Sequence, residues 1–321
     1  MRKPVDGAAA AIMLLLCAIW GLQQVAIKAA AADIAPMLQV AWRSGVAALL
    51  VWLFDRIVVR DNWLPGIALR AGVPVGLLFA LEFLFIAEGL RWTNASHMAV
   101  LLYTAPMFAA IGLHVRLPDE RLSALQWAGI GVAFAGIAVC FIGPTLVPGA
   151  RHATANAPNW LLGDFFALCG GAAWGFTTVA VRVSRLSEAP PTQTLFYQLA
   201  GGFIVLLPFA WLTGDTHWHG SAFALGSLAF QTVVVSFASY LTWFWLLRRY
   251  FAARLGVLSF MTPLFGVALG VVLLHEELDA SFAVGAILVL AGLVIVNAQA
   301  MLRQAFARDP AKRERESARS S

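Results

Sequence analysis

The chain has 321 residues, of which 60% are hydrophobic and only 12% are charged, and its mean hydropathy is +0.79. Soluble domains average about 45–50% apolar and about 25% charged residues, so this composition excludes an ordinary soluble fold. The net charge of +5 comes from residues between apolar runs and in one tail, which does not indicate nucleic-acid binding. The composition predicts an all-α integral membrane protein in contact with the lipid bilayer, because helices satisfy their own backbone groups in lipid.

Ten uninterrupted apolar runs divide the chain, each near the roughly 20 residues that a membrane-crossing helix needs. They lie near residues 8–31, 36–54, 71–90, 94–115, 124–143, 161–183, 191–213, 222–247, 253–275 and 281–300. Turn and charge clusters such as Asp55-Arg56 and Pro190-Pro191 separate them. The longest polar connection, residues 144–160, stands in the middle of the chain and marks a seam between two halves.

The basic residues predict the orientation of these helices. If the N-terminus is cytoplasmic, eighteen of the 22 lysines and arginines fall on the cytoplasmic side and three on the other. Because basic loops stay in the cytoplasm, we expect both termini there, in a bacterial-type inner (plasma) membrane. Residues 303–321 are expected to form a basic cytoplasmic tail. The first apolar run is too long for a cleaved signal peptide.

The two halves of the chain repeat one another. Residues 18–28 read AIWGLQQVAIK, and 154 positions later residues 172–182 read AAWGFTTVAVR. The match continues through later spans, where Pro106 aligns with Pro263. Such self-similarity indicates a duplicated structural unit.

We therefore expect two five-helix repeats, at residues 8–143 and 161–300. Because five is an odd number, the second repeat must enter the membrane from the opposite face. The prediction is an inverted-topology repeat of ten transmembrane helices, and such folds place their ligand near the membrane midplane.

These residues resemble the drug/metabolite transporter (DMT) superfamily, specifically its EamA-type members with ten helices. The recurring marks are a Trp-Gly in the first helix of each half, a proline in the fourth, an acidic turn before the fifth and a glycine-rich fifth helix. In this chain they are Trp20-Gly21 and Trp174-Gly175, Pro106 and Pro263, Glu120 and Glu277, and Gly129, Gly136, Gly285 and Gly292. The resemblance covers residues 8–300. It implies proton- or gradient-coupled efflux of an amino acid, metabolite or drug, without specifying which.

A charge within or beside a membrane span is costly, so function is its default explanation, and five ionisable side chains of the first half are candidates. They are Lys28, Arg43, Glu82, Glu88 and His97. Glu82 is the candidate proton carrier, with the alternative that Arg43 or a hydroxyl holds it without titration. Lys28, Arg43 and Glu88 are candidates for an outer salt-bridge gate or a fold clamp. His97 is a candidate proton relay or an interfacial histidine.

The second repeat does not duplicate these charges. It carries Ser239 at the position of Glu82, and Gln198 at the position of Arg43. We therefore expect any specific chemistry where the two copies differ.

Aromatic, amide and hydroxyl side chains gather at middle depth. They are Trp20, Gln23, Gln24, Tyr103, Trp174, Thr177, Thr178, Gln231, Ser239, Tyr240 and Trp243. Such walls suit a small amphipathic substrate, although the same groups also pack helices together. Pro106 and Pro263 are candidate hinges, or fixed kinks.

These observations predict a secondary transporter, not an enzyme, that exports a small amphipathic metabolite by alternating access, as a monomer or homodimer. We expect no cofactor and no metal. The alternative is an integral-membrane enzyme acting on a lipid-soluble substrate, for which His217-Trp-His219 is a weak metal-binding pattern. A channel is disfavoured because no filter-like loop is visible.

Overall fold

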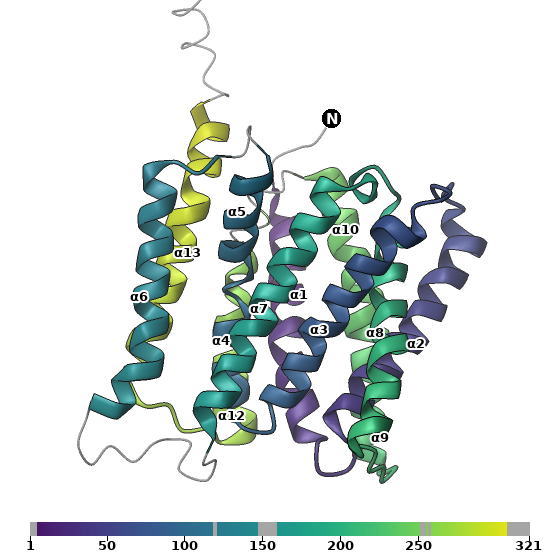
Figure 1. Ribbon diagram of the computed structural model, residues 1–321, viewed down its shortest axis with the longest axis horizontal. Coiled ribbons are helices and arrows are strands. Elements are labelled where there is room, and N and C mark those ends of the chain that lie inside the picture. The colour runs from purple at the N-terminus through teal and green to yellow at the C-terminus, as the bar shows by residue number, and fades with distance from the viewer. Residues whose placement is uncertain (1–4, 118–120, 147–158, 251–254, 256–257, 307–321) are drawn as a thin grey trace, which may run out of the picture.

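A computed structural model describes residues 5–117, 121–146, 159–250, 255 and 258–306, and within them the chain is helical, with no β-strand (Figure 1). The α-helices are α1 (Gly7–Ala29), α2 (Pro36–Phe54), α3 (Val73–Gly89), α4 (Ala95–Leu102), α5 (Ala105–Arg116), α6 (Ala124–Leu146), α7 (Trp160–Val183), α8 (Pro191–Thr213), α9 (Ala222–Ala229), α10 (Tyr240–Arg249), α12 (Met261–Leu274) and α13 (Ala280–Phe306). Three π-helical segments, η1 (Asp55–Val59), η2 (Ala68–Gly72) and η5 (Phe230–Ser239), and one 3₁₀ turn, η4 (Arg185–Ser187), join or extend them.

Every predicted apolar run overlaps at least one of these helices. In the described part of the chain, eight helices are long and apolar enough to cross a membrane, and two shorter apolar helices span Met261–Leu274 and Ala280–Val296. Large apolar side chains face outward, as they do in lipid: Leu212 is 85% exposed and Val115 is 73% exposed. The expectation of an all-helical membrane protein is confirmed.

Local sequence signals set several helix ends. The Asp6 carboxylate accepts the N–H of Ala9 at 2.9 Å and caps α1, and the Ser221 hydroxyl caps α9 in the same way. Pro36 and Pro191 open α2 and α8, where a missing N–H costs nothing. Gly214, with a φ of 72°, ends α8 in a left-handed conformation that glycine adopts without strain.

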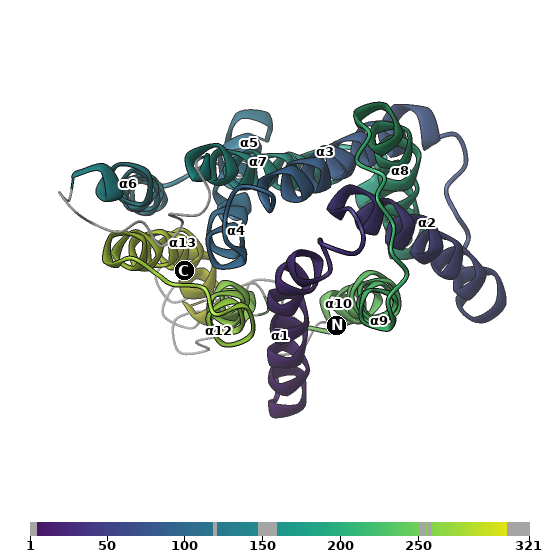
Figure 2. The same cartoon turned by 90° about the horizontal axis from the view of Figure 1, so that it is seen from below.

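The helices stand in two rows, which Figure 2 shows end-on. One row holds α6, α5 with α4, α7, α3 and α8, and the other holds α13, α12, α1, α10 with α9, and α2. Close packing of α6 on α13 and of α2 on α8 joins the rows at their two ends. The start of α1 and the end of α13 lie at the upper end in Figure 1, whereas α4, α7 and α9 begin at the lower end.

The fourth predicted span is broken rather than continuous. A turn at Tyr103 and Thr104 separates α4 from α5, so Pro106 stands in the first turn of a new helix, where proline fits. The Thr104 hydroxyl donates to the carbonyl of Leu101 at 2.7 Å. Pro263 likewise stands in the first turn of α12. Both prolines therefore begin helices instead of kinking them.

Glycines bring α6 and α13 together backbone to backbone. A Cβ atom at Gly129 would lie 2.8 Å from the carbonyl oxygen of Gly292, and one at Gly136 would lie 2.6 Å from that of Gly285. Helices in lipid gain little from the hydrophobic effect, so they associate through such close van der Waals contact.

Gly136→Ala should lower the stability of the protein. Its Cβ would lie 2.6 Å from both the Gly285 oxygen and the Val289 nitrogen, which are backbone atoms. Overpacking of this kind costs about 1–3 kcal/mol. Gly131→Ala on the same helix is the matched control, because nothing lies within 4 Å of its Cβ. In thermal unfolding of the detergent-solubilised protein, only Gly136→Ala should lower the midpoint; equal midpoints for the two variants would contradict the close packing.

Candidate functional site

A polar network joins several helix ends at the lower end of the molecule. The Lys28 ammonium at the end of α1 lies 3.5 Å from the Glu276 carboxylate and donates to the carbonyl of Thr93 at 2.5 Å. Glu276 also accepts the N–H groups of Ala95 and Ser96, the first residues of α4, at 2.7 and 2.9 Å. A carboxylate is favoured there because the first N–H groups of a helix lack intrahelical partners. Glu276 thereby ties the α12–α13 connection to α1 and α4.

A second buried carboxylate, Asp164 of α7, lies in the same region and is 0% exposed. It accepts a hydrogen bond from the Thr93 hydroxyl, and Nδ1 of His97 lies 2.9 Å from its Oδ2. The His97 ring stacks on Phe282 with the ring centroids 3.7 Å apart. His97 is 1% exposed, so it belongs to the interior of the lower end rather than to the membrane interface.

Two loops cover this end, residues 30–35 after α1 and residues 214–221 before α9. They form one isolated antiparallel bridge, and Nε2 of His217 lies 2.9 Å from the carbonyl oxygen of Ala31. The backbone N–H of His219 donates to the first of these loops at 2.7 Å. These contacts give the His217-Trp-His219 segment a role in holding the loops together.

Different polar contacts join helices at the upper end. The Thr192 hydroxyl, at the start of α8, donates to Asp55 at 2.7 Å. The side chain of Gln193 forms two hydrogen bonds with the backbone of Leu64, both 2.9 Å long. These contacts fix the start of α8 against the connection between α2 and α3.

Between the two ends, the structure brings several predicted binding residues together. The Trp20 indole N–H donates to the Ser239 hydroxyl at 2.9 Å, and its ring meets Trp243 edge to face with the centroids 5.7 Å apart. Tyr103 and Trp174 form a second edge-to-face pair, 5.3 Å between centroids. Each matched tryptophan, Trp20 and Trp174, therefore contacts an aromatic residue from the other half of the chain.

Arg43 of α2 is a buried charged group in this middle region. Its side chain is 0% exposed, and its guanidinium carbon lies 4.3 Å from the ring centroid of Phe83. No acceptor among the described residues lies within hydrogen-bonding distance of its Nε, Nη1 or Nη2. The ionisable groups that act electrostatically on it are Tyr240 and Glu82 of α3. Glu82 is only 6% exposed, yet it forms no direct hydrogen bond with Arg43.

One turn before Arg43, Gln39 connects α2 to α1 and η5. Its amide group donates to the carbonyls of Ile27 and Ile34 at 3.1 and 2.7 Å, and its Oε1 accepts from Gln231 at 2.8 Å. The Oε1 atoms of Gln24 and Gln231 are buried and receive no hydrogen bond from the described residues. The buried middle of the bundle thus holds acceptors as well as donors without partners.

Other predicted residues have more local contacts. The hydroxyls of Thr177 and Thr178 donate to carbonyls of their own helix at 2.9 and 3.3 Å, and Thr178 is exposed. Gln23 is buried. Glu88 pairs with Arg91 at 3.4 Å, a partly exposed ion pair of the kind that contributes little free energy.

Sequence reasoning misses three residues that the structure places in these networks. Glu276 is visible as part of an acidic turn, but the repeat alignment selects the neighbouring Glu277 instead. Asp164 is an acidic residue within an apolar span. The same signal makes Glu82 a candidate, so it could also have identified Asp164. Gln39 has no distinguishing signal, since its partners come from segments distant in the sequence.

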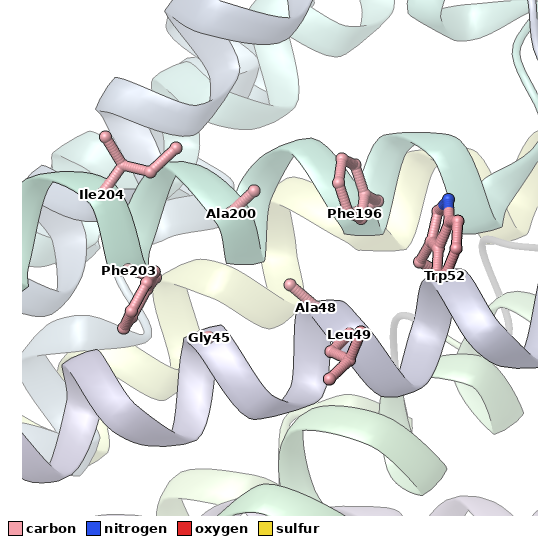
Figure 3. A pocket seen from close by; sticks show the side chains of 8 residues that line it. All are labelled: Gly45, Ala48, Leu49, Trp52, Phe196, Ala200, Phe203 and Ile204. Carbon is pink, nitrogen blue, oxygen red and sulfur yellow. The ribbon is translucent and has the colours of Figure 1, made fainter.

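A separate apolar groove lies on the outer surface between α2 and α8 (Figure 3). It is lined by Gly45, Ala48, Leu49, Trp52, Phe196, Ala200, Phe203 and Ile204. Leu49 and Ile204 are exposed, and the Trp52 indole is the one lining side chain with a polar atom. This groove faces lipid and offers little to a polar ligand, so the buried middle is the better candidate site.

Two similar proteins each match more than four fifths of this chain. The protein named "Probable amino-acid metabolite efflux pump" of Salmonella typhimurium is 27% identical over 295 residues, covering 88% of this chain and 93% of that protein. A Bacillus subtilis protein named as an uncharacterized transporter is 23% identical over 279 residues, covering 86% of this chain and 91% of that protein.

A solved crystal structure has the same fold, with a TM-score of 0.60 at 20% identity over 92% of this chain and 100% of that chain. The model of the EamA-like transporter family matches residues 8–142 and again residues 161–298. These matches and the apolar helices identify a multi-pass membrane transporter and not an enzyme. The chain belongs to the EamA-like transporter family, within the DMT superfamily.

Proposed function

We propose that this protein exports a small amphipathic metabolite, an amino acid or a drug-like molecule, by alternating access driven by protons or another gradient. The observation that carries the proposal is a buried polar middle with unpaired groups, closed at one end by contacts between the two halves. The relatives named "Probable amino-acid metabolite efflux pump" in Salmonella typhimurium and Escherichia coli support export and this substrate class.

Paired contacts support the inverted repeat. A twofold axis in the membrane plane requires that a contact between two residues recur between their counterparts. A Cβ at Gly21 would lie 2.7 Å from the nitrogen of Gly266, and one at Gly175 would lie 2.9 Å from that of Ala109. Gly175 is the counterpart of Gly21, and Ala109 is the counterpart of Gly266. The two rows in Figure 2 agree, because the matched helices α1 and α7 fall in different rows, as do α6 and α13.

We assign residues 8–143 and 161–300 to the two repeats of a ten-helix bundle that acts as a monomer or homodimer. The basic residues support a cytoplasmic upper end in an inner (plasma) membrane, with both termini on that side. Of the expected cytoplasmic tail at 303–321, residues 307–321 lie outside the described part of the chain.

Alternating access requires that the lower end open and close. The Lys28–Glu276 pair is the candidate gate, because it joins α1 of the first half to the α12–α13 connection of the second. Pro106 and Pro263 are the candidate hinges, since each begins a helix beside a break or bend in its span. Access from the cytoplasm would then alternate with access from outside.

Glu82 is the candidate proton carrier. It is a buried carboxyl group on one half only, and the matching residue of the other half is Ser239. A carboxyl group can be neutral or charged as it is exposed to either side of the membrane, whereas a fixed ion pair cannot fulfil that role.

Lys28→Met should open the lower end more often, because it removes the cation that bridges Glu276 and the Thr93 carbonyl. A loss of about 1 kcal/mol corresponds to about fivefold in the population of the open form. The reporter is Gln24→Cys, one turn inside Lys28, in a background without the three native cysteines. A membrane-impermeant maleimide added to intact cells should label it about fivefold faster in the Lys28→Met background.

Arg185→Met is the control, because it removes an exposed cation after the end of α7, away from the lower end. It should leave the labelling rate unchanged. Equal rates in the Lys28→Met and unmodified backgrounds would mean that the pair does not hold this end closed.

Transport itself can be tested in inside-out vesicles with an imposed pH gradient, acidic inside, against a panel of amino acids, aromatic metabolites and cationic drugs. The proposed function predicts gradient-driven accumulation of at least one solute, and accumulation of none would contradict it. Glu82→Gln should abolish the response to the gradient while downhill movement continues, because an amide carries no proton. Glu188→Gln, an exposed acid at the upper end, should transport normally. Full gradient-driven accumulation in Glu82→Gln would refute its role as proton carrier.

A further inference from the structure

We propose that the groove between α2 and α8 binds one anionic phospholipid, with an acyl chain in the groove and the phosphate on Arg56 at the upper end. A lipid site on the outer surface goes beyond the proposed transport function and does not depend on which solute is exported. The lipid belongs to the leaflet at the upper end, which is the cytoplasmic leaflet in the proposed orientation.

The groove has room for an acyl chain. Its volume is about 290 Å³, and its lining is apolar except for the indole nitrogen of Trp52. An apolar cavity of roughly 150 Å³ is already large enough to bind benzene. Several methylene groups therefore fit between the two helices.

The length of the groove matches the depth of one leaflet. Gly45, its innermost residue on α2, lies near the middle of the membrane span Pro36–Val59. Arg56 follows Gly45 by eleven residues, which is about 16 Å along the helix axis. Half of the hydrocarbon core of a bilayer is about 15 Å thick. An acyl chain that ends at Gly45 thus brings its head group to the level of Arg56.

Aromatic side chains form the inner end of the groove. A Cβ atom at Gly45 would lie 2.5 Å from Cδ2 of Phe203, so the Phe203 ring covers this glycine. The Trp42 ring packs against Phe203 with the centroids 5.9 Å apart. Figure 3 shows Phe203 at one end of the groove and Trp52 at the other. Tryptophan is enriched at the membrane–water interface, so Trp52 marks the end that is nearer to the head groups.

Arg56 stands at this upper end and is linked to both walls of the groove. It follows Trp52 by four residues where α2 continues into η1, so the two side chains project from the same side. Its guanidinium carbon lies 5.2 Å from the ring centroid of Trp63, which lies 5.2 Å from the ring centroid of Phe196 on α8. A guanidinium group in this position can bind a phosphate through two parallel N–H···O bonds.

The exposed charges on the connection between α2 and α3 are basic. Arg56, Arg60 and Arg70 are exposed, whereas Asp55 is buried and Asp61 is half-buried. Basic side chains at the membrane surface attract anionic lipids. A zwitterionic head group carries a cation beside its phosphate, which the arginines repel. The charge of this region therefore favours an anionic phospholipid.

The repeat provides an internal comparison. Leu49 of the groove matches Ile204 of the groove, so both copies supply its apolar lining. Arg56 instead matches Trp211, which is 70% exposed. A surface that only contacts lipid tails needs no cation, whereas a site for one anionic head group needs a cation at one end.

The first test measures lipid binding to the full-length, unmodified protein by native mass spectrometry from detergent micelles. Dioleoylphosphatidylglycerol is anionic, dioleoylphosphatidylcholine is zwitterionic with the same acyl chains, and glycerol 3-phosphate has a phosphate without chains. We expect one molecule of the phosphatidylglycerol to bind about fivefold more tightly than the phosphatidylcholine, which is the contribution of one basic side chain to binding an anionic lipid. Glycerol 3-phosphate should not bind at the same concentrations, because it has no chain to bury.

The second test uses Arg56→Gln, with Arg249→Gln as the matched control. Arg249 is also an exposed arginine at the upper end and lies 4.5 Å from the ring centroid of Trp245, but its helix α10 contributes no residue to the groove. Arg56→Gln should bind the two lipids equally, and Arg249→Gln should keep the preference for the anionic lipid. An unchanged preference in Arg56→Gln would contradict the assigned phosphate site.

A third test fills the groove. Ala200 lies in its middle (Figure 3), so the indole of Ala200→Trp would occupy the space of the acyl chain. Binding of the phosphatidylglycerol should weaken about tenfold, the factor that corresponds to about two methylene groups. Ala135→Trp on the exposed face of α6 is the matched control and should bind the lipid normally.

Equal affinity of the unmodified protein for the two lipids would overturn this inference. Tight binding of glycerol 3-phosphate would also overturn it and indicate a site for a soluble phosphate. A dimer that Ala200→Trp dissociates would make the groove an interface between two copies of the chain instead. None of these outcomes affects gradient-driven export, so they leave the proposed function standing.

Discussion

Hydrocarbon offers a charged or polar group no water, so each such group inside the bundle needs a protein partner or raises the free energy of the fold. At the lower end two carboxylates meet this constraint through contacts with distant segments. Glu276 is surrounded by Lys28 and the first N–H groups of α4, and Asp164 by Thr93 and His97. These bonds position α1, α4, α7 and the α12–α13 connection against one another, and the covering loops pack on the end that results.

Close helix crossings provide a different kind of contact. Gly21 and Gly175 lie against the backbone of α12 and α5 near the proline-led starts of those helices. Such contacts depend on shape and on the absence of a side chain, and they contain no directional bond that must break before two helices shift. The bundle thus combines polar contacts at its lower end with glycine contacts between helices, a combination that fits the proposed alternating access.

The sequence predicts the spans well because a run of about 20 apolar residues is a direct requirement of the bilayer. It predicts a bend near Pro106 but not the complete break between α4 and α5. The π-helical segment η5 cannot be recognised from hydropathy, because its residues are as apolar as those of an α-helix. For the site, the sequence predicts that Trp20 and Ser239 lie at the same middle depth. In the structure the two side chains are hydrogen-bonded to each other. The sequence passes over Glu276, since the partners of that side chain are set by tertiary packing and not by any local spacing.

Burial is costly both for the paired charges at the lower end and for the unpaired Arg43. The paired charges have used their hydrogen-bonding capacity on protein partners, whereas that of Arg43 remains free among the described residues. A guanidinium group whose donors were already satisfied could bind a ligand only by first losing those bonds. Arg43 forms no such bonds with the described residues. A ligand shifts a conformational equilibrium only by its differential affinity for the two states. A substrate that binds more tightly when the lower end is open would supply free energy that offsets the separation of Lys28 from Glu276. Recognition and gating then belong to one equilibrium.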